Sequence, residues 1–170
     1  WDYYLLDYFH LVNKKHVLYK LRNGLNFICR VGINDVGILK ENFITKPYFY
    51  RQHTIKPDDT VVDIGAHIGT FSILASQIAR NGTVFSYEPL PQNYELLKQN
   101  IKLNSIINIT PFNLAVSSKR SKKKLYFSES YLSNPHLDNS LPNSSISVPI
   151  KCITLEDIIK TNHIDKIDFL

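Results

Sequence analysis

Along this chain, segments in which hydrophobic residues recur every second position alternate with segments in which they recur every three to four positions. The first pattern is typical of strands and the second of helices, so the chain is expected to alternate the two. The clearest change lies in the centre of the sequence. Residues 61–64 form a short β-branched run that predicts a buried parallel strand, and the apolar period of residues 71–79 predicts a helix. Gly65 and Gly69 fall between them. The pattern therefore predicts a strand, a glycine-containing turn and a helix N-terminus at the centre of the fold.

The N-terminal part of the chain predicts a helix, a hairpin and a second helix. Residues 1–12 carry apolar residues on nearly every side and predict a helix across the sheet. Asn23-Gly24 separates two alternating runs at 16–22 and 25–31, which predicts a β-hairpin with positive φ at both turn residues. A further helix is expected from Asp35 to before Pro47. The apolar face expected for it consists of Ile38, Leu39, Phe43 and Ile44.

The C-terminal part continues the alternation of strands and helices. The expected elements are strands at 83–87 and 108–112, a helix from Pro91 to Asn104, paired strands at 123–128 and 145–152, a helix capped by Thr154 and running to Lys160, and a strand from Lys166. The segment between the paired strands is expected to be a long loop. Because right-handed crossovers are the rule, we expect the Val61 strand between the Thr83 and Lys166 strands and the Asn108 strand outermost. The N-terminal hairpin should then lie outside this fold.

Length and composition fit one α/β domain. The chain has 170 residues, of which 44% are hydrophobic and 21% charged, so a sizeable core is expected. We divide it into an extension at 1–50 and a core domain at 51–170. Two features, the absence of Met and the strand-like residues at Leu170, predict that this is a piece of a longer protein that exposes an apolar edge and self-associates when made alone. Residues 1–12 resemble neither a signal peptide nor a membrane span, so we expect a cytoplasmic enzyme.

Charge and cysteine content exclude several classes of function. The net charge is +5, but its densest cluster, at residues 119–124, has no aromatic residue between the cations, which favours a solvated turn over a phosphate-binding patch. We therefore expect no nucleic-acid partner. Cys29 and Cys152 are too few and too far apart for a disulfide framework or a zinc site, so buried free thiols and no metal are expected.

The glycine turn indicates the ligand. In an open α/β sheet, such a turn lies at the carboxyl end of a strand, where free N–H groups of the next helix face a nucleotide-like ligand. Gly65 allows the backbone to approach the ligand, Gly69 allows the helix to pack closely, and Asp63 places a negative charge at the strand end. A dinucleotide fingerprint needs glycines where this chain has His67 and Thr70. The actual pattern, D-x-G-A-x-x-G, resembles the first motif of class I S-adenosylmethionine-dependent methyltransferases.

Two later strand ends supply further candidates for the cofactor site. Glu88 follows the second strand 19 positions after Gly69, near the interval at which nucleotide-binding α/β folds place the acid that accepts both ribose hydroxyls. Alone it would be read as a surface acid, but together with the Asp63 motif the ribose role is favoured. Asn113, or the backbone of Leu114 and Ala115, is a candidate for the adenine edge. For Asn113 an ordinary turn residue is an equally good interpretation.

The ordered set of motifs from residue 35 to 170 resembles the FkbM-type methyltransferases. The matching features are Glu41 and the segments 62–69, 87–89, 100–104, 115–117, 154–157 and 167–170. The resemblance implies a Rossmann-like class I fold that stops after the start of its fourth core strand, with Ala66 and His67 among the cofactor-binding residues and Glu41 on the substrate side. His67 departs from the family, which usually has Asn there. The acids expected beyond Leu170 are missing from this sequence.

The resemblance implies that an acceptor oxygen of a sugar or another small molecule or glycan attacks the methyl group of S-adenosylmethionine. The cofactor carries the chemistry and the protein supplies positioning and a general base. His67 is a weak candidate for that base, since packing over the cofactor or bonding to the loop is the favoured interpretation, and His53 is weaker still. Two alternatives stay open: a nicotinamide-dependent oxidoreductase, which the missing second glycine disfavours, and a catalytically silent binding module.

Overall fold

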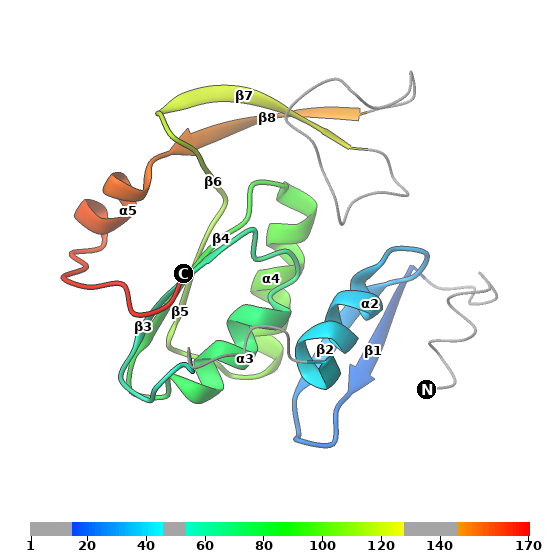
Figure 1. Ribbon diagram of the computed structural model, residues 1–170. Helices are drawn as coiled ribbons and strands as arrows, with labels where there is room; N and C mark the ends of the chain where they lie inside the picture. Colours follow the sequence, from blue (N-terminus) through cyan, green and yellow to red (C-terminus); the bar gives the residue numbers. More distant parts are fainter. Residues whose placement is uncertain (1–14, 46–53, 128–145) are drawn as a thin grey trace.

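The computed structural model describes residues 15–45, 54–127 and 146–170. The expected helix at 1–12, His53 and the loop between the paired strands lie outside these residues. Within them the chain forms a parallel sheet with helices and two hairpins around it (Figure 1). No helix in the described part is both long and apolar enough to cross a membrane.

The central sheet has the predicted order. Strands β3 (Thr60–Ile64), β4 (Thr83–Tyr87) and β5 (Ile109–Phe112) are parallel and adjacent in that order. On the free side of β3, Val61 forms a parallel bridge to Phe169, and the Val62 N–H donates to the Phe169 carbonyl at 2.9 Å. This confirms the predicted position of β3 between the Thr83 strand and the C-terminal residues, with the Asn108 strand outermost.

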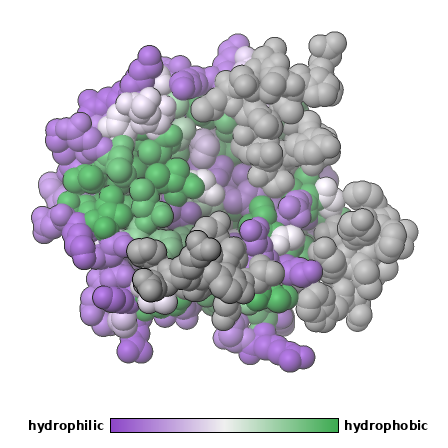
Figure 2. Space-filling view, viewed as in Figure 1, coloured by the Kyte–Doolittle hydropathy of each residue, from purple (hydrophilic) through white to green (hydrophobic). Residues whose placement is uncertain are grey.

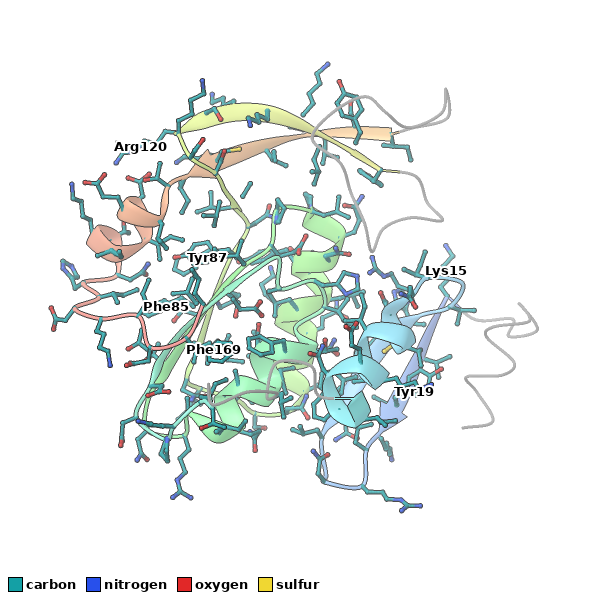
Figure 3. All side chains as sticks on the ribbon, viewed as in Figure 1. Lys15, Tyr19, Phe85, Tyr87, Arg120 and Phe169 are labelled. Atoms are coloured by element: carbon teal, nitrogen blue, oxygen red, sulfur yellow. The ribbon has the colours of Figure 1, made fainter. Side chains whose placement is uncertain are left out.

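The two faces of the sheet are covered differently. Helices α3 (Thr70–Ile78) and α4 (Pro91–Leu103) pack on one face, where Val61 and Val84 are fully buried. On the other face, Val62 and Tyr87 pack with Ile158 of α5 (Leu155–Thr161), whose N-terminus has the expected Thr154 capping box. Figure 2 shows a continuous apolar area on the left of the view, where Figure 1 places α5 and the end of the chain. In Figure 3, Phe85 and Tyr87 project from β4 on this side.

The predicted N-terminal hairpin is present, but its turn differs. Strands β1 (His16–Lys20) and β2 (Asn26–Arg30) are antiparallel, with Lys20 opposite Asn26. Only Gly24 has a positive φ, of 89°, and its N–H donates to the Leu21 carbonyl at 3.1 Å. The expectation of positive φ at both Asn23 and Gly24 was therefore wrong. A longer loop with a single left-handed glycine replaces the two-residue turn.

The expected helix after Asp35 changes its geometry halfway. It is α-helical as α2 (Asp35–Lys40) and continues as the π-helical turn η1 (Glu41–Thr45). The wider turn shifts the register, so that Asn42 is buried and Ile44 is 55% exposed. Ile44 was wrongly assigned to the apolar face because a 3.6-residue period does not hold through a π turn.

Asn100 of α4 and Asn104, the residue that caps its C-terminus, attach the N-terminal hairpin to the core. The Asn100 side chain accepts from the Ile28 N–H at 2.8 Å and donates to the Ile28 carbonyl at 3.3 Å. Asn104 does the same for Asn26, at 2.8 and 2.7 Å. Four residues of helix rise about 6 Å, close to the repeat of about 6.7 Å between alternate strand residues. The two asparagine side chains therefore bond the free N–H and carbonyl groups at the outer edge of β2, as a third strand would.

The paired strands of the C-terminal half are confirmed as β7 (Ser121–Phe127) and β8 (Ile146–Ile153), with the short β6 (Ala115–Val116) parallel to β8. Ser121–Lys124 belongs to β7, so the interpretation of residues 119–124 as one turn was wrong. Lys122 and Lys124 are nevertheless exposed, because alternate residues of β7 pack Leu125 and Phe127 on the inner side. Cys29 and Cys152 are buried free thiols, as expected.

Candidate functional site

The loop between β3 and α3 is held by the end of the neighbouring strand. The N–H groups of Gly65 and Ala66 both donate to the Tyr87 carbonyl, at 2.8 and 3.1 Å. Gly65 and Gly69 have left-handed φ values of 83° and 87°. A Cβ on Gly69 would lie 2.4 Å from the Leu97 side chain, whereas a Cβ on Gly65 would meet nothing within 4 Å. The distance at Gly69 agrees with the predicted close helix packing, and the approach of a ligand to the Gly65 backbone stays a prediction.

A cavity of about 240 Å³ lies at this carboxyl end of β3. Four of the predicted cofactor-binding residues line it: Asp63, Gly65, Ala66 and His67. The other walls come from α2 and η1, from α3 and from the C-terminal residues, through Ile38, Asn42, Thr70, Phe71, Phe169 and Leu170. Among the described residues, no group of three or more His, Cys, Asp and Glu side chains could hold a metal ion.

Asp63 is buried against the start of α3. Its Oδ2 accepts a short hydrogen bond from the Ser72 hydroxyl, which in turn accepts one from the Ser86 hydroxyl at 2.8 Å. Burial raises the Asp63 pKa to about 6, and the bonds from Ser72 oppose that rise. At neutral pH, this side chain therefore supplies a negative charge to the cavity wall at a cost in solvation.

Glu88 faces the glycine loop, and its exposed fraction is 3%. Its Oε2 accepts from the His67 N–H at 2.8 Å, and its Oε1 accepts from the Leu90 N–H at 2.8 Å and from Asn93 Nδ2 at 3.3 Å. Burial raises its pKa. A carboxylate has about four acceptor positions, so three of them are already used. Acceptance of two ribose hydroxyls stays a prediction, and it requires one of these bonds to be exchanged.

His67 lines the cavity, and its ring also contacts Arg30 and Asp35. Its Nε2 lies 3.2 Å from Arg30 Nη2 and 3.4 Å from Asp35 Oδ1, and its Nδ1 is enclosed. Desolvation lowers the His67 pKa to about 4, against the attraction of Asp35. The geometry thus favours the structural interpretation of His67 over its role as a general base.

The remaining predicted site residues lie away from the cavity wall. Asn113 is exposed and donates to the Glu88 and Pro89 carbonyls, at 2.8 and 3.0 Å, so it lies at the end of β4. Ala115 is buried in the apolar cluster beneath β7 and β8. Glu41 is exposed in η1, next to the cavity-lining Asn42. The adenine role of Asn113 and Ala115 and the substrate role of Glu41 stay predictions.

Sequence reasoning missed three polar residues of the site, Arg30, Asp35 and Asn42. Each lies in the segment that was read as an extension outside the cofactor fold. The one available signal was Asp35 at the predicted start of a helix, and a cap is the ordinary interpretation of an acid there. The burial of Asn42 depends on the π turn, which periodicity does not predict.

One family model and several solved structures are similar to this chain. Residues 50–127 match the family model described as the TRM5/TYW2 methyltransferase domain. The chain is also similar to a crystal structure of TYW2 from M. jannaschii in complex with AdoMet, at 26% identity, a TM-score of 0.44, and coverage of 59% of this chain and 44% of that one. It is similar to the methyltransferase FkbM from Methylobacillus flagellatus KT, at 17% identity, a TM-score of 0.43, and coverage of 70% and 27%.

A third similar structure is the Pyrococcus abyssi tRNA (uracil-54, C5)-methyltransferase in complex with S-adenosyl-L-homocysteine, at 11% identity, a TM-score of 0.39, and coverage of 62% and 28%. No curated protein matches the chain. The chain spans less than half the length of each of these three structures.

The sheet order and the family match establish a class I methyltransferase fold and a methyltransferase-type domain, as the sequence predicted. S-adenosylmethionine is the cofactor of that class, and the predicted cofactor agrees with it. The narrower assignment to the FkbM family is not established, since the matched model belongs to TRM5/TYW2. The comparisons also do not support the expectation that the chain has no nucleic-acid partner.

Proposed function

We propose that this chain is the cofactor-binding part of an enzyme that transfers a methyl group from S-adenosylmethionine to an acceptor. The observation that carries the proposal is the left-handed glycine loop beside a cavity at the carboxyl end of β3. The segment that matches a methyltransferase domain, residues 50–127, contains this loop. A Cβ on Gly65 would occupy open space there, so the backbone leaves room for a ligand to approach.

In this proposal the chain's own residues bind and orient the cofactor. Asp63 and Asn42 contribute polar groups to the cavity wall, Glu88 fixes the loop and is the candidate for the ribose, and Asn113 is the candidate for the adenine edge. S-adenosylmethionine supplies an electrophilic methyl group when bound. Methyl transfer then depends on the placement of the acceptor atom in line with that group, which is the task of positioning residues.

We propose a hydroxyl oxygen of a sugar or another small molecule or glycan as the acceptor, on the resemblance to FkbM-type enzymes. An RNA acceptor is the second candidate. The outer face of the β7–β8 hairpin exposes Lys122, Lys124 and Lys151, with Lys122 directly opposite Lys151. Like charges placed opposite each other disfavour pairing unless an anion lies between them.

A cytoplasmic location and self-association of the 170-residue chain are further parts of this proposal.

Isothermal calorimetry with S-adenosylhomocysteine and with NAD⁺ tests the cofactor. We expect binding of S-adenosylhomocysteine and none of NAD⁺; the reverse would favour the oxidoreductase alternative, and binding of neither would contradict the cofactor assignment. Transfer of labelled methyl groups by the full-length protein, offered a set of oligosaccharides and a set of RNAs, then tests the acceptor. Label in RNA alone would contradict the sugar proposal, and binding without transfer to any acceptor would favour the silent module.

A further inference from the structure

We propose that Arg30 and Asp35 are positioning residues of the cofactor site and act on it through His67. Neither side chain lines the cavity, and both belong to the N-terminal unit, here meaning β1, β2 and α2. Figure 1 shows that unit beside α3 and α4. The inference rests on the proposed function and adds that a segment outside the central sheet sets the shape of the glycine loop.

The first link is a buried ion pair within the N-terminal unit. Arg30 donates to the Asp35 carboxylate twice through its guanidinium, from Nε at 2.9 Å and from Nη2 at 2.7 Å, and once through its own N–H at 2.8 Å. Asp35 is fully buried and the exposed fraction of Arg30 is 8%. A two-pronged guanidinium–carboxylate pair fixes the orientation of both groups. Arg30 Nη2 therefore has a defined position from which to contact another residue.

The second link joins this pair to the glycine loop. Arg30 Nη2 lies 3.2 Å from His67 Nε2. A guanidinium only donates hydrogen bonds, so Nε2 must be the acceptor and the ring proton is assigned to Nδ1. Burial favours the neutral ring, and in this tautomer the Nδ1 proton has no partner among the described residues. Asp35 Oδ1 lies 3.4 Å from the same ring nitrogen and 2.7 Å from Arg30 Nη2, so the ring contacts both members of the ion pair.

The third link runs along the backbone of His67 to the proposed ribose acid. His67 has a φ of 53°, in the left-handed region that histidine seldom adopts, and its N–H donates to Glu88 Oε2 at 2.8 Å. Because the main chain is strained there, the fixed ring helps to hold this conformation. One continuous set of hydrogen bonds therefore connects Asp35, Arg30, His67 and Glu88.

A second Arg–Asp pair, with an exposed Arg, provides a chemical control. Arg120 also binds a carboxylate through Nε and Nη2, that of Asp157, which caps α5. Figure 3 shows Arg120 beside α5, away from Lys15 and Tyr19 of the N-terminal hairpin. Neither Arg120 nor Asp157 lines the cavity. Arg30→Lys and Arg120→Lys are therefore the same chemical change in two pairs, of which only one is linked to the loop.

The test measures S-adenosylhomocysteine affinity by calorimetry and amide hydrogen exchange of residues 64–71 without ligand. In the unchanged chain, ligand binding tests the proposed function by itself. We expect Arg30→Lys to weaken affinity about tenfold, the size of one charge-assisted hydrogen bond, and to speed exchange in the loop. Arg120→Lys should leave both within about twofold. Equal effects of the two variants, or an unchanged affinity in Arg30→Lys, would overturn the inference.

A double-mutant cycle separates positioning from general support. His67→Asn keeps a residue that tolerates positive φ but removes the ring, so it should fold even where Arg30→Lys does not. We expect His67→Asn alone to weaken affinity for S-adenosylhomocysteine several-fold. The dissociation constant of the double variant should then be at most about twice that of whichever single variant binds more weakly. Single effects that multiply in the double variant, or a His67→Asn protein that binds as well as the unchanged chain, would show that Arg30 does not act through His67.

Discussion

The two hairpins of this molecule are attached to the central sheet in different ways. The N-terminal hairpin, β1–β2, packs Phe27 and Cys29 into the main apolar cluster and is also joined by buried polar groups: Asn100 and Asn104 bond its edge, and Arg30 contacts His67. The β7–β8 hairpin is joined by apolar side chains, with Leu125 and Phe127 in one cluster with Leu90.

This difference matters because buried polar contacts are directional and costly to leave unsatisfied, whereas apolar contacts tolerate small shifts. A hairpin held by hydrogen bonds has one position relative to the loop. It is therefore able to set the geometry of a site, although it lies outside the sheet that forms that site. The comparison also predicts that polar substitutions in the two hairpins differ greatly in their effects.

Removal of the carboxylate at Asp35 should have the largest effect. Asp35→Ala leaves the Arg30 guanidinium buried without its counter-charge, so we expect a loss of about 3–5 kcal/mol in the free energy of unfolding. Urea denaturation followed by circular dichroism measures it. A loss below about 1 kcal/mol would mean that water reaches Arg30, and the contrast between the hairpins would fail.

The asparagine contacts should rank second. Asn100→Ala removes bonds to both backbone groups of Ile28 and to the Ile68 carbonyl at 2.9 Å, so we expect a loss of about 2–3 kcal/mol. Asn81→Ala is the control, since the Asn81 side chain donates to Asp58 in an exposed contact. Denaturation curves of the two variants give the difference. Similar losses would show that the edge of β2 does not need Asn100.

Two groups with shifted pKa values should give opposite pH dependence. The folded pKa of His67, lowered from 6.5 to about 4, makes stability fall as pH drops from about 6.5 to 4, because only the unfolded chain takes up the proton. The folded pKa of Asp63, raised from 3.8 to about 6, makes stability rise as pH drops from 6 to about 4. The two contributions nearly cancel in the unchanged chain.

Variants separate these contributions. As pH is lowered from 6.5 to 4, the free energy of unfolding of His67→Asn should rise by about 2 kcal/mol relative to that of the unchanged chain. For Asp63→Asn it should fall by a similar amount. Thermal melts over this range measure both. Parallel curves for all three proteins would show that neither group titrates as its surroundings suggest.

The smallest effect on stability is expected from the Arg120–Asp157 pair, beside the β7–β8 hairpin. Arg120→Gln removes the charged partner of Asp157 but leaves the Thr154 capping box of α5 in place. Exposed ion pairs contribute little, so we expect the melting temperature to change by less than about 2 °C and to change less in high salt. A larger shift would mean that the Arg120–Asp157 pair holds the β7–β8 hairpin as firmly as Arg30 and Asp35 hold the other.

The central sheet and its order were predictable because each signal is local. β-Branched runs, Pro91 at a helix start and Thr154 at a cap act within a few residues. The glycine loop was predictable for the same reason. The contact of Arg30 and Asp35 with His67 was not predictable, because it depends on which polar groups meet in the core, and no local period encodes that meeting. The register change at Glu41 and the single left-handed residue of the hairpin turn also depend on packing between distant segments.

The most direct test of the cofactor site compares Asn substitutions at two left-handed glycines. Gly24 and Gly65 have φ values of 89° and 83°, and a Cβ on either would meet nothing within 4 Å, but only Gly65 lines the cavity. Asn tolerates this conformation, so both variants should fold. Calorimetry with S-adenosylhomocysteine should give unchanged affinity for Gly24→Asn and a loss of at least about tenfold for Gly65→Asn, equivalent to about 1.4 kcal/mol. Equal affinity in the two variants would contradict a cofactor site at this loop.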